Sequence, residues 1–164
     1  MASIAATLRA ARPAVMRLAP RAAARSFSTS RISLVRKYAE SHEWVDLSAD
    51  GKTGYIGITE YAAKQLGDVV FVELPEVGAA IGAGEPIGAV ESVKSASDVL
   101  TPIPCKVLKV NTALEETPKN INSLPEDDSA GGGWIAKIEV TEDGAEIFDT
   151  LMDAETYKAS IAEE

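Results

Sequence analysis

The chain has 164 residues, of which 46% are hydrophobic and 25% charged, and its mean hydropathy is close to zero. This is the composition of a globular protein, and the length suits one domain. No apolar run reaches the ~20 residues that a membrane span needs. One cysteine and one histidine exclude a disulfide framework and a Cys/His zinc site. The net charge of −9 argues against a nucleic-acid binder, which needs a basic surface.

The charge is divided unevenly along the chain. Residues 1–36 hold all seven arginines and no acidic residue, whereas residues 37–164 hold nine lysines and all 25 acidic residues, a balance of −16. An arginine-rich, acid-free start with serines near its end is typical of an organellar transit peptide. We therefore expect residues 1–36 to direct the protein to the mitochondrial matrix, with cleavage between residues 25 and 37. A disordered basic arm is the alternative.

From residue 37 onward, short β-forming runs alternate with turn residues, and residues 48–51 form one such turn. Thr59 is the expected N-cap of a helix that Gly67 ends. Two further helices are expected over residues 142–151 and from Asp153 to about residue 161. The candidate strands are residues 44–47, 53–58, 69–73, 86–90, 98–103, 107–110 and 133–140. Many short strands with a few small helices predict a β-sandwich or flattened barrel.

Two segments near the end of this β-rich region have distinct signatures. Residues 133–140 alternate between apolar and polar positions, which predicts a half-buried strand that includes Trp134 and excludes Ile135 from the buried face. Residues 125–133 are rich in glycine and acidic side chains, which predicts a mobile surface loop.

The segment from residue 84 to residue 99 carries one lysine between two β-forming runs. This pattern predicts a hairpin that presents Lys94 at its tip. A solvated, unhindered lysine is the substrate that an acylating enzyme requires, and the small neighbours Ser92, Ser95 and Ala96 leave room for such an enzyme. The alternative is that Lys94 is one of nine ordinary surface lysines.

The sequence contains no phosphate-binding loop, nucleophile elbow or metalloprotease motif. Cys105 lies beside Lys106 without a second candidate base, so we expect a packed thiol and not a nucleophile. His42 beside Glu43 is the single acid–base pair with a histidine, and such a pair is usually structural. The chain therefore lacks the residues of a self-sufficient enzyme.

Residues 37–140 resemble the H protein of the glycine cleavage system, a lipoyl-carrying protein. The resemblance covers about 100 residues in order, and the helices that follow fit more loosely. The matching stretches are residues 41–45, 57–59, 61–62, 66–78 and 91–94, with Asn111, Leu114 and residues 133–134.

This resemblance implies a flattened β-barrel of two sheets, related to the hammerhead lipoyl and biotinyl carrier domains, with small peripheral helices. It implies that Lys94 is the residue amide-linked to lipoic acid, so residues 37–164 would form the carrier domain. The protein would be a shuttle without catalytic activity of its own. The partners would be a pyridoxal-phosphate glycine decarboxylase, a tetrahydrofolate-dependent aminomethyltransferase, dihydrolipoamide dehydrogenase and the lipoate-attaching enzymes.

In this family the loaded arm folds into a cleft that keeps its aminomethyl group from water. Ser41, Glu43 and Asp98 match the positions implicated there, and a carboxylate suits a cationic amine. For Glu43 the alternative is a charge at the edge of a strand. Glu91, three residues before the lysine, is expected to serve in recognition by the ligase or in the turn.

The sequence departs from the family pattern in two places. Residues 104–106 replace a Ser-Gly-Glu-like turn, so Cys105 implies a different turn or local strain. The loop at residues 127–133 is also longer and richer in glycine. The alternatives to this function are a lipoyl or biotinyl domain of another multienzyme complex, whose tips read Asp-Lys-Ala or Met-Lys-Met, and an interaction module without a cofactor.

Overall fold

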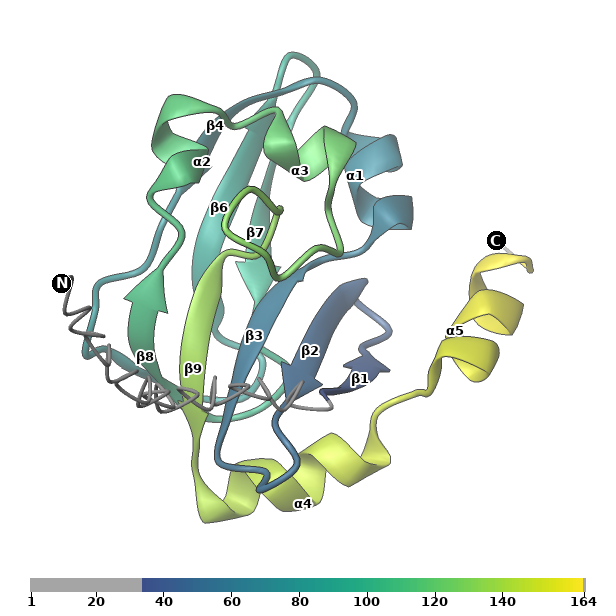
Figure 1. The fold of residues 1–164 in the computed structure, drawn as a ribbon. Helices are drawn as coiled ribbons and strands as arrows, with labels where there is room; N and C mark the ends of the chain where they lie inside the picture. Colours follow the sequence, from purple (N-terminus) through teal and green to yellow (C-terminus); the bar gives the residue numbers. More distant parts are fainter. Residues whose placement is uncertain (1–33, 164) are drawn as a thin grey trace, which may run out of the picture. The chain divides into compact units, whose positions relative to one another are not determined.

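Nine strands and five short helices form the described part of the chain, residues 34–163 of the computed structural model (Figure 1). The targeting segment expected over residues 1–36 lies outside the described residues, apart from its last three positions. Among residues 34–163, no helix is long and apolar enough to cross a membrane.

The larger sheet has six antiparallel strands in the order β1-β2-β3-β9-β8-β5. Each strand pairs with its neighbours through a defined register, for example Trp44 opposite Gly57 and Ile56 opposite Ala136. Its strands are β1 (Val35–Tyr38), β2 (Glu43–Leu47), β3 (Thr53–Ile58), β5 (Ala80–Ile81), β8 (Cys105–Val110) and β9 (Ala136–Val140).

The smaller sheet has three antiparallel strands, β4 (Val69–Glu73), β6 (Pro86–Ser92) and β7 (Ala96–Leu100), with β6 in the middle. The sequence analysis expected a mainly β fold of two sheets with small helices, and the structure confirms it. The expected bounds of β3 and β4 also match the observed ones.

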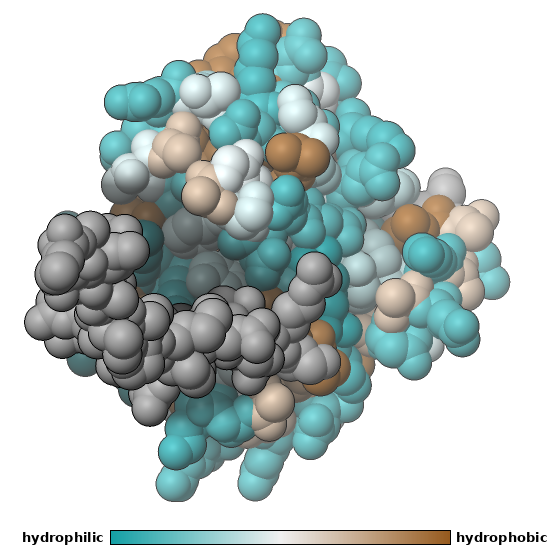
Figure 2. Space-filling view, viewed as in Figure 1, coloured by the Kyte–Doolittle hydropathy of each residue, from teal (hydrophilic) through white to brown (hydrophobic). Residues whose placement is uncertain are grey.

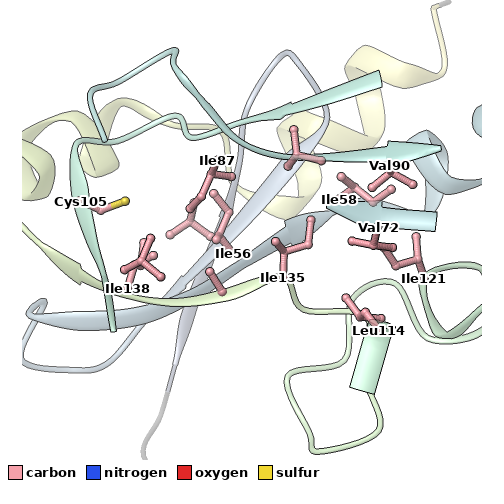
Figure 3. Close-up of a cluster of buried hydrophobic side chains, with 14 of the residues drawn as sticks. Ile56, Ile58, Val72, Ile87, Val90, Cys105, Leu114, Ile121, Ile135 and Ile138 are labelled. Carbon is pink, nitrogen blue, oxygen red and sulfur yellow. The ribbon is translucent and has the colours of Figure 1, made fainter. Parts of the chain in front are cut away.

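The hydrophobic core lies between the two sheets (Figure 3). Figure 3 shows Ile87 and Val90 of β6 on one side and Ile56 and Ile138 of the larger sheet on the other. All four side chains are at most 2% exposed. Burial of such side chains supplies the main favourable term for folding, at roughly 25 cal/mol per Å² of apolar surface.

The helices are α1 (Glu60–Leu66), α2 (Ala113–Glu116), α3 (Asn120–Ser123), α4 (Glu142–Thr150) and α5 (Ala154–Ile161). The caps read from the sequence are confirmed, because Thr59 accepts a hydrogen bond from Ala62 N and Asp153 accepts one from Thr156 N. Gly67 ends α1 with φ of 79°, in the left-handed region that favours glycine.

Four elements were not foreseen: β1, β5, α2 and α3. Each has only two to four residues, which is too short to show a hydrophobic period. The expected strand at residues 98–103 is displaced, since β7 starts at Ala96 and ends at Leu100. The alternation expected over residues 133–140 is wrong at Ile135, which is fully buried. Ile135 lies one residue before β9, so the two-residue period of the strand does not apply to it.

Residues 125–133 form a loop that is exposed at residues 129–131, as expected, but its ends are buried, which the sequence did not predict. The loop is tied to the fold by hydrogen bonds from the Trp44 indole to Pro125 O, from the Trp134 indole to Ser129 O and from Asn111 Nδ2 to Gly132 O. Gly132 and Gly133 are buried, and a Cβ on Gly132 would collide with the carbonyl of Asp127. Glycine serves close packing here, which composition alone cannot distinguish from flexibility.

Of the two expectations for Cys105, a different turn or local strain, the structure shows no positive φ at this residue. Cys105 starts β8 and pairs with Val140 of β9. Its side chain is 2% exposed, and burial raises the pKa of the thiol. It is therefore a packed thiol, as expected.

Candidate functional site

Lys94 lies at the tip of the β6–β7 hairpin and is exposed, as the sequence predicted. Ser92 stabilises the turn, because its hydroxyl oxygen accepts hydrogen bonds from the backbone N–H groups of Lys94 and Ser95, each at 3.1 Å. The backbone N–H of Ser92 also donates to Ser95 O at 2.7 Å. The turn therefore holds the lysine by local hydrogen bonds and leaves its side chain accessible.

The hairpin tip rests on the segment between α1 and β4. Val93 N donates to Asp68 O at 3.0 Å, and in Figure 1 the β6–β7 turn and this segment lie together at the top of the view. The Lys94 side chain passes over Gly67, where a Cβ atom would lie 2.7 Å from its Cε. Glycine at this position therefore allows the lysine stem to lie against bare backbone.

Asn122 of α3 holds this supporting segment from the other side. Its Oδ1 accepts from Val69 N at 2.9 Å, and its Nδ2 donates to Gly67 O at 2.8 Å. Both polar ends of one amide thus fix the two residues that flank Asp68, whose carbonyl receives the hairpin tip. Sequence reasoning missed Asn122 because the contact spans 53 residues and α3 has no recognisable pattern.

A cleft of about 410 Å³ begins beside the tip, where Ser95 and Ser97 form part of its wall. The three residues that the sequence placed in an arm-docking cleft, Ser41, Glu43 and Asp98, all line it. The structure thus brings together residues from the start of β2 and from β7 that are more than 50 positions apart.

Glu43 is the buried charged group of this cleft, with 3% of its surface exposed. Its Oε1 accepts from the backbone N–H of Leu100 at 3.1 Å, and its Oε2 accepts from the Ser41 hydroxyl at 2.5 Å. Burial raises the pKa of the Glu43 carboxyl, and these two hydrogen bonds act against that rise. Glu43 is the first residue of β2, as the alternative of a charge at the edge of a strand expects, but its side chain is buried and hydrogen-bonded.

Asp98 and Glu91 lie on the exposed surface of the smaller sheet. Asp98 is opposite Ala89 in the sheet register and borders the cleft. Glu91 is opposite Phe71 and Ala96, is exposed and does not line the cleft. Its expected role in recognition by the ligase or in the turn stays a prediction.

Further residues of the cleft were not identified from the sequence. The rings of His42 and Tyr61 lie 4.7 Å apart and both line it, together with Gln65 and Leu66 of α1. The sequence singled out His42 only as a neighbour of Glu43, and it gave no reason to place α1 beside the cleft, because α1 faces the cleft only after the two sheets have packed. The short helix α1 therefore forms one wall of the cleft that contains Glu43, and it ends at Gly67, against which the Lys94 side chain lies.

Other candidate sites lack this combination. A cleft of about 450 Å³ lies around Glu73, Pro86 and Gly88 and shares Asp98, but it contains no buried ionisable side chain. No cluster of three or more metal-ligating side chains occurs among the residues that the structure describes. The cleft beside Lys94 is the smaller of the two, but it alone combines an adjoining exposed lysine with a buried carboxylate.

The family model described as "Glycine cleavage H-protein" matches residues 36–164. The chain is 49% identical over 135 residues to a glycine cleavage system H protein of Shewanella woodyi, a match that covers 82% of this chain and 99% of the relative. It is also 49% identical over 127 residues to the H protein of Coprothermobacter proteolyticus, covering 77% and 94% of the two chains.

The fold agrees with these matches. A crystal structure of a glycine cleavage system H protein from Mycobacterium marinum superposes with a TM-score of 0.67 at 36% identity, covering 77% of this chain and 96% of that one. The chain therefore belongs to the family of glycine cleavage H-proteins, the non-catalytic lipoyl shuttles of the glycine cleavage system.

Proposed function

We propose that Lys94 is the lipoyl attachment site and that the loaded arm docks in the cleft around Glu43. The observation that carries this proposal is the position of an exposed lysine at a hairpin tip directly beside a cleft with a buried carboxylate. When bound, the lipoyl group supplies a disulfide that is reduced as one sulfur takes up the aminomethyl group of decarboxylated glycine, and that is reoxidised after the carbon has left.

The residues present fit such a group. Lys94 is exposed, and its stem lies against Gly67, the C-cap of α1, whose residues Gln65 and Leu66 line the cleft. The cleft combines apolar walls at Val90 and Val99 with the polar groups of Ser41 and Glu43. A cationic amine would gain a charge-assisted hydrogen bond from the Glu43 carboxylate, and the apolar walls would exclude water from it.

The partners follow from the family and from the surface around the tip. We propose that the decarboxylase, the aminomethyltransferase, dihydrolipoamide dehydrogenase and the lipoate-attaching enzymes all contact the end of the hairpin. Val93 and Phe71 are 69% and 53% exposed there, with Glu91 and Asp68 beside them. Figure 2 shows a mostly hydrophilic face with hydrophobic atoms in small separate patches. The exposed Val93 and Phe71 side chains, with acidic residues beside them, suit partners that present an apolar pocket surrounded by basic residues.

The location of the protein is a separate proposal. The charge of +7 over residues 1–36, without any acidic residue, supports a mitochondrial targeting segment and a function in the matrix. Because β1 begins at Val35, we propose that cleavage falls between residues 25 and 34. The mass of the mature protein from mitochondria tests both the cleavage and the modification.

The attachment site is tested with Lys94→Arg. Arginine keeps the charge but stays protonated, so it cannot be acylated. The tip is exposed, so stability should change by no more than about 0.5 kcal/mol. Intact mass should show a lipoyl adduct on the wild type and none on the variant, and transfer of glycine carbon to tetrahydrofolate should stop. Residual transfer by the variant as sole carrier would refute the assignment, and a biotinyl adduct would favour a different carrier family.

The docking role is tested with Glu43→Ala in the lipoylated protein. We expect normal lipoylation and a shorter lifetime of the aminomethyl-loaded carrier in water, because the docking contact is missing. Ser48→Ala is the control, since it also removes a polar side chain but lies at the β2–β3 turn away from the cleft. Equal lifetimes for Glu43→Ala and the wild type would refute docking and leave the attachment site untouched.

A further inference from the structure

Tyr157 of α5 makes two hydrogen bonds directly behind the cleft. Its hydroxyl lies 2.9 Å from His42 Nδ1 and 2.8 Å from Thr59 Oγ1. Tyr157 is 4% exposed and Thr59 is fully buried, so the bond between them is shielded from water, whereas the bond to the half-buried His42 is only partly shielded. The Tyr157 ring also stacks on Tyr38 of β1 with 4.7 Å between the ring centroids. The C-terminal helix is thus joined to the segment that carries the cleft residues.

His42 has an unusual backbone conformation. Its φ is 72°, and no other non-glycine residue in the described range 34–163 has a positive φ. Such a conformation is unfavourable for a residue with a side chain and persists only where the surroundings hold it. The backbone is held on both sides, because His42 N donates to Ala39 O at 3.1 Å and Thr59 N donates to His42 O at 2.9 Å.

This conformation determines the geometry of the cleft. His42 lies between Ser41 and Glu43, and a left-handed residue at this position reverses the chain so that the Ser41 hydroxyl meets the Glu43 carboxylate. The His42 ring also packs on Tyr61, which is another residue of the cleft wall. Whatever holds His42 therefore holds both the polar end and one wall of the cleft.

We propose that Tyr157 is a positioning residue for the docked arm: its hydroxyl fixes His42 and Thr59, and through them the orientation of Ser41 and Glu43. Tyr157 itself does not line the cleft. The inference deepens the proposed function and rests on it, because it assigns the C-terminal helix to protection of the cargo. It gives α5, whose Tyr157 is 115 positions from His42 in the sequence, a physical role in holding the cleft.

The first test uses the protein without its lipoyl group. Tyr157→Phe removes only the hydroxyl and keeps the ring stacked on Tyr38. Tyr55→Phe is the matched control, because it makes the same chemical change on β3, where the ring packs against Trp134 outside the cleft. Amide hydrogen exchange is measured at Thr59 and Leu100, whose N–H groups bond to His42 O and Glu43 Oε1, with Ile135 N–H as the internal reference.

We expect exchange at Thr59 and Leu100, relative to Ile135, to rise at least about three- to tenfold in Tyr157→Phe, the effect expected for each of the two hydrogen bonds that are lost. Tyr55→Phe should leave both ratios unchanged. Equal ratios in Tyr157→Phe and the wild type would overturn the proposal, because the hydroxyl would then not hold the cleft.

The second test uses the lipoylated, aminomethyl-loaded carrier. Tyr157→Phe should be lipoylated at the wild-type rate, because the hairpin tip is untouched, but its loaded form should decay about three- to tenfold faster in water. A wild-type lifetime in this variant would refute the role of Tyr157 and leave docking intact. If the loaded wild type decayed as fast as free aminomethyl-dihydrolipoamide, docking itself would be refuted, so the two failures are distinguishable.

Discussion

The Glu43 carboxylate accepts a hydrogen bond from the backbone N–H of Leu100, 3.1 Å away, and so connects β2 of the larger sheet to β7 of the smaller one. A buried carboxylate is costly unless it is hydrogen-bonded, and Ser41 and Leu100 supply the two bonds. The group that is proposed to receive the cargo therefore also bridges the two sheets at the cleft.

This relationship predicts a pH dependence of stability. Burial raises the folded-state pKa of Glu43 above its ordinary value of 4.5. Between the unfolded and folded pKa values the native state binds more protons, so the contribution of Glu43 to stability is full below the unfolded value and falls as pH rises through the folded one. Glu43→Gln cannot ionise and should lack this fall.

Urea unfolding of both proteins at a series of pH values from below 4.5 to neutral tests this prediction. The free energy of unfolding of Glu43→Gln, relative to the wild type, should increase with pH over this range. A difference that is constant with pH would show that Glu43 ionises as easily in the folded protein as in the unfolded chain.

The contact between Lys94 and Gly67 gives a second prediction. Gly67→Ala places a Cβ 2.7 Å from Lys94 Cε and forces alanine to φ of 79°. The backbone strain should destabilise the protein by about 1–3 kcal/mol, because φ of 79° with ψ of −154° is a conformation found almost only for glycine. Displacement of the lysine stem should slow lipoate attachment. Gly84→Ala is the control, because Gly84 has the same φ with no atom within 4 Å of its Cβ position. Equal attachment rates in the two variants would show that Gly67 matters only for its backbone angle.

Arg36 gives a third prediction, about the start of the folded domain. Its guanidinium forms two hydrogen bonds with the buried Asp46, of 2.8 and 2.6 Å, contacts Glu126 at 3.2 Å and lies over the Trp44 ring. Arg36→Ala leaves Asp46 buried without its partner. We expect a loss near the lower end of the ~3–5 kcal/mol seen for broken buried pairs, because the arginine side chain is 25% exposed.

Unfolding midpoints of two truncated proteins provide the measurement. A chain that starts at residue 34 keeps Arg36 and should unfold at the same temperature as the full-length protein. A chain that starts at residue 37 lacks Arg36 and should unfold at a clearly lower temperature. Lys64→Ala, at the exposed pair with Glu60, is the control and should change the midpoint little. Equal midpoints for the two truncated chains would show that Arg36 does not stabilise the domain, and would contradict the proposal that cleavage falls before Val35.

The acidic surface gives a fourth prediction. Residues 37–164 carry a charge of −16, so association with the partner enzymes should weaken between about 0.1 and 1 M salt, as the screening length falls from ~10 to ~3 Å. Glu91→Gln, beside the tip, should reduce this salt dependence more than Glu139→Gln on β9, if partners bind at the hairpin end. An affinity that does not change with salt would exclude electrostatic recognition.

Local features of the sequence determined much of the fold. The helix that Thr59 starts and Gly67 ends, the two C-terminal helices, and the hairpin that presents Lys94 could all be predicted, because caps and turns depend on residues a few positions apart. The same locality explains why Lys94 was identified as the chemically informative residue: its accessibility follows from the turn alone.

The contacts that build the cleft depended on the tertiary structure. Glu43 and Leu100 are 57 residues apart, and His42 and Tyr157 are 115 apart, and no periodicity links such pairs. Other tertiary contacts were equally hidden: the loop at residues 125–133 is hydrogen-bonded by Asn111, Trp44 and Trp134, and Arg36 is bonded to Asp46. Sequence thus determined where Lys94 is presented, and only the packing of the two sheets and α5 decided what surrounds it, because buried hydrogen bonds form between segments that meet only in the folded chain.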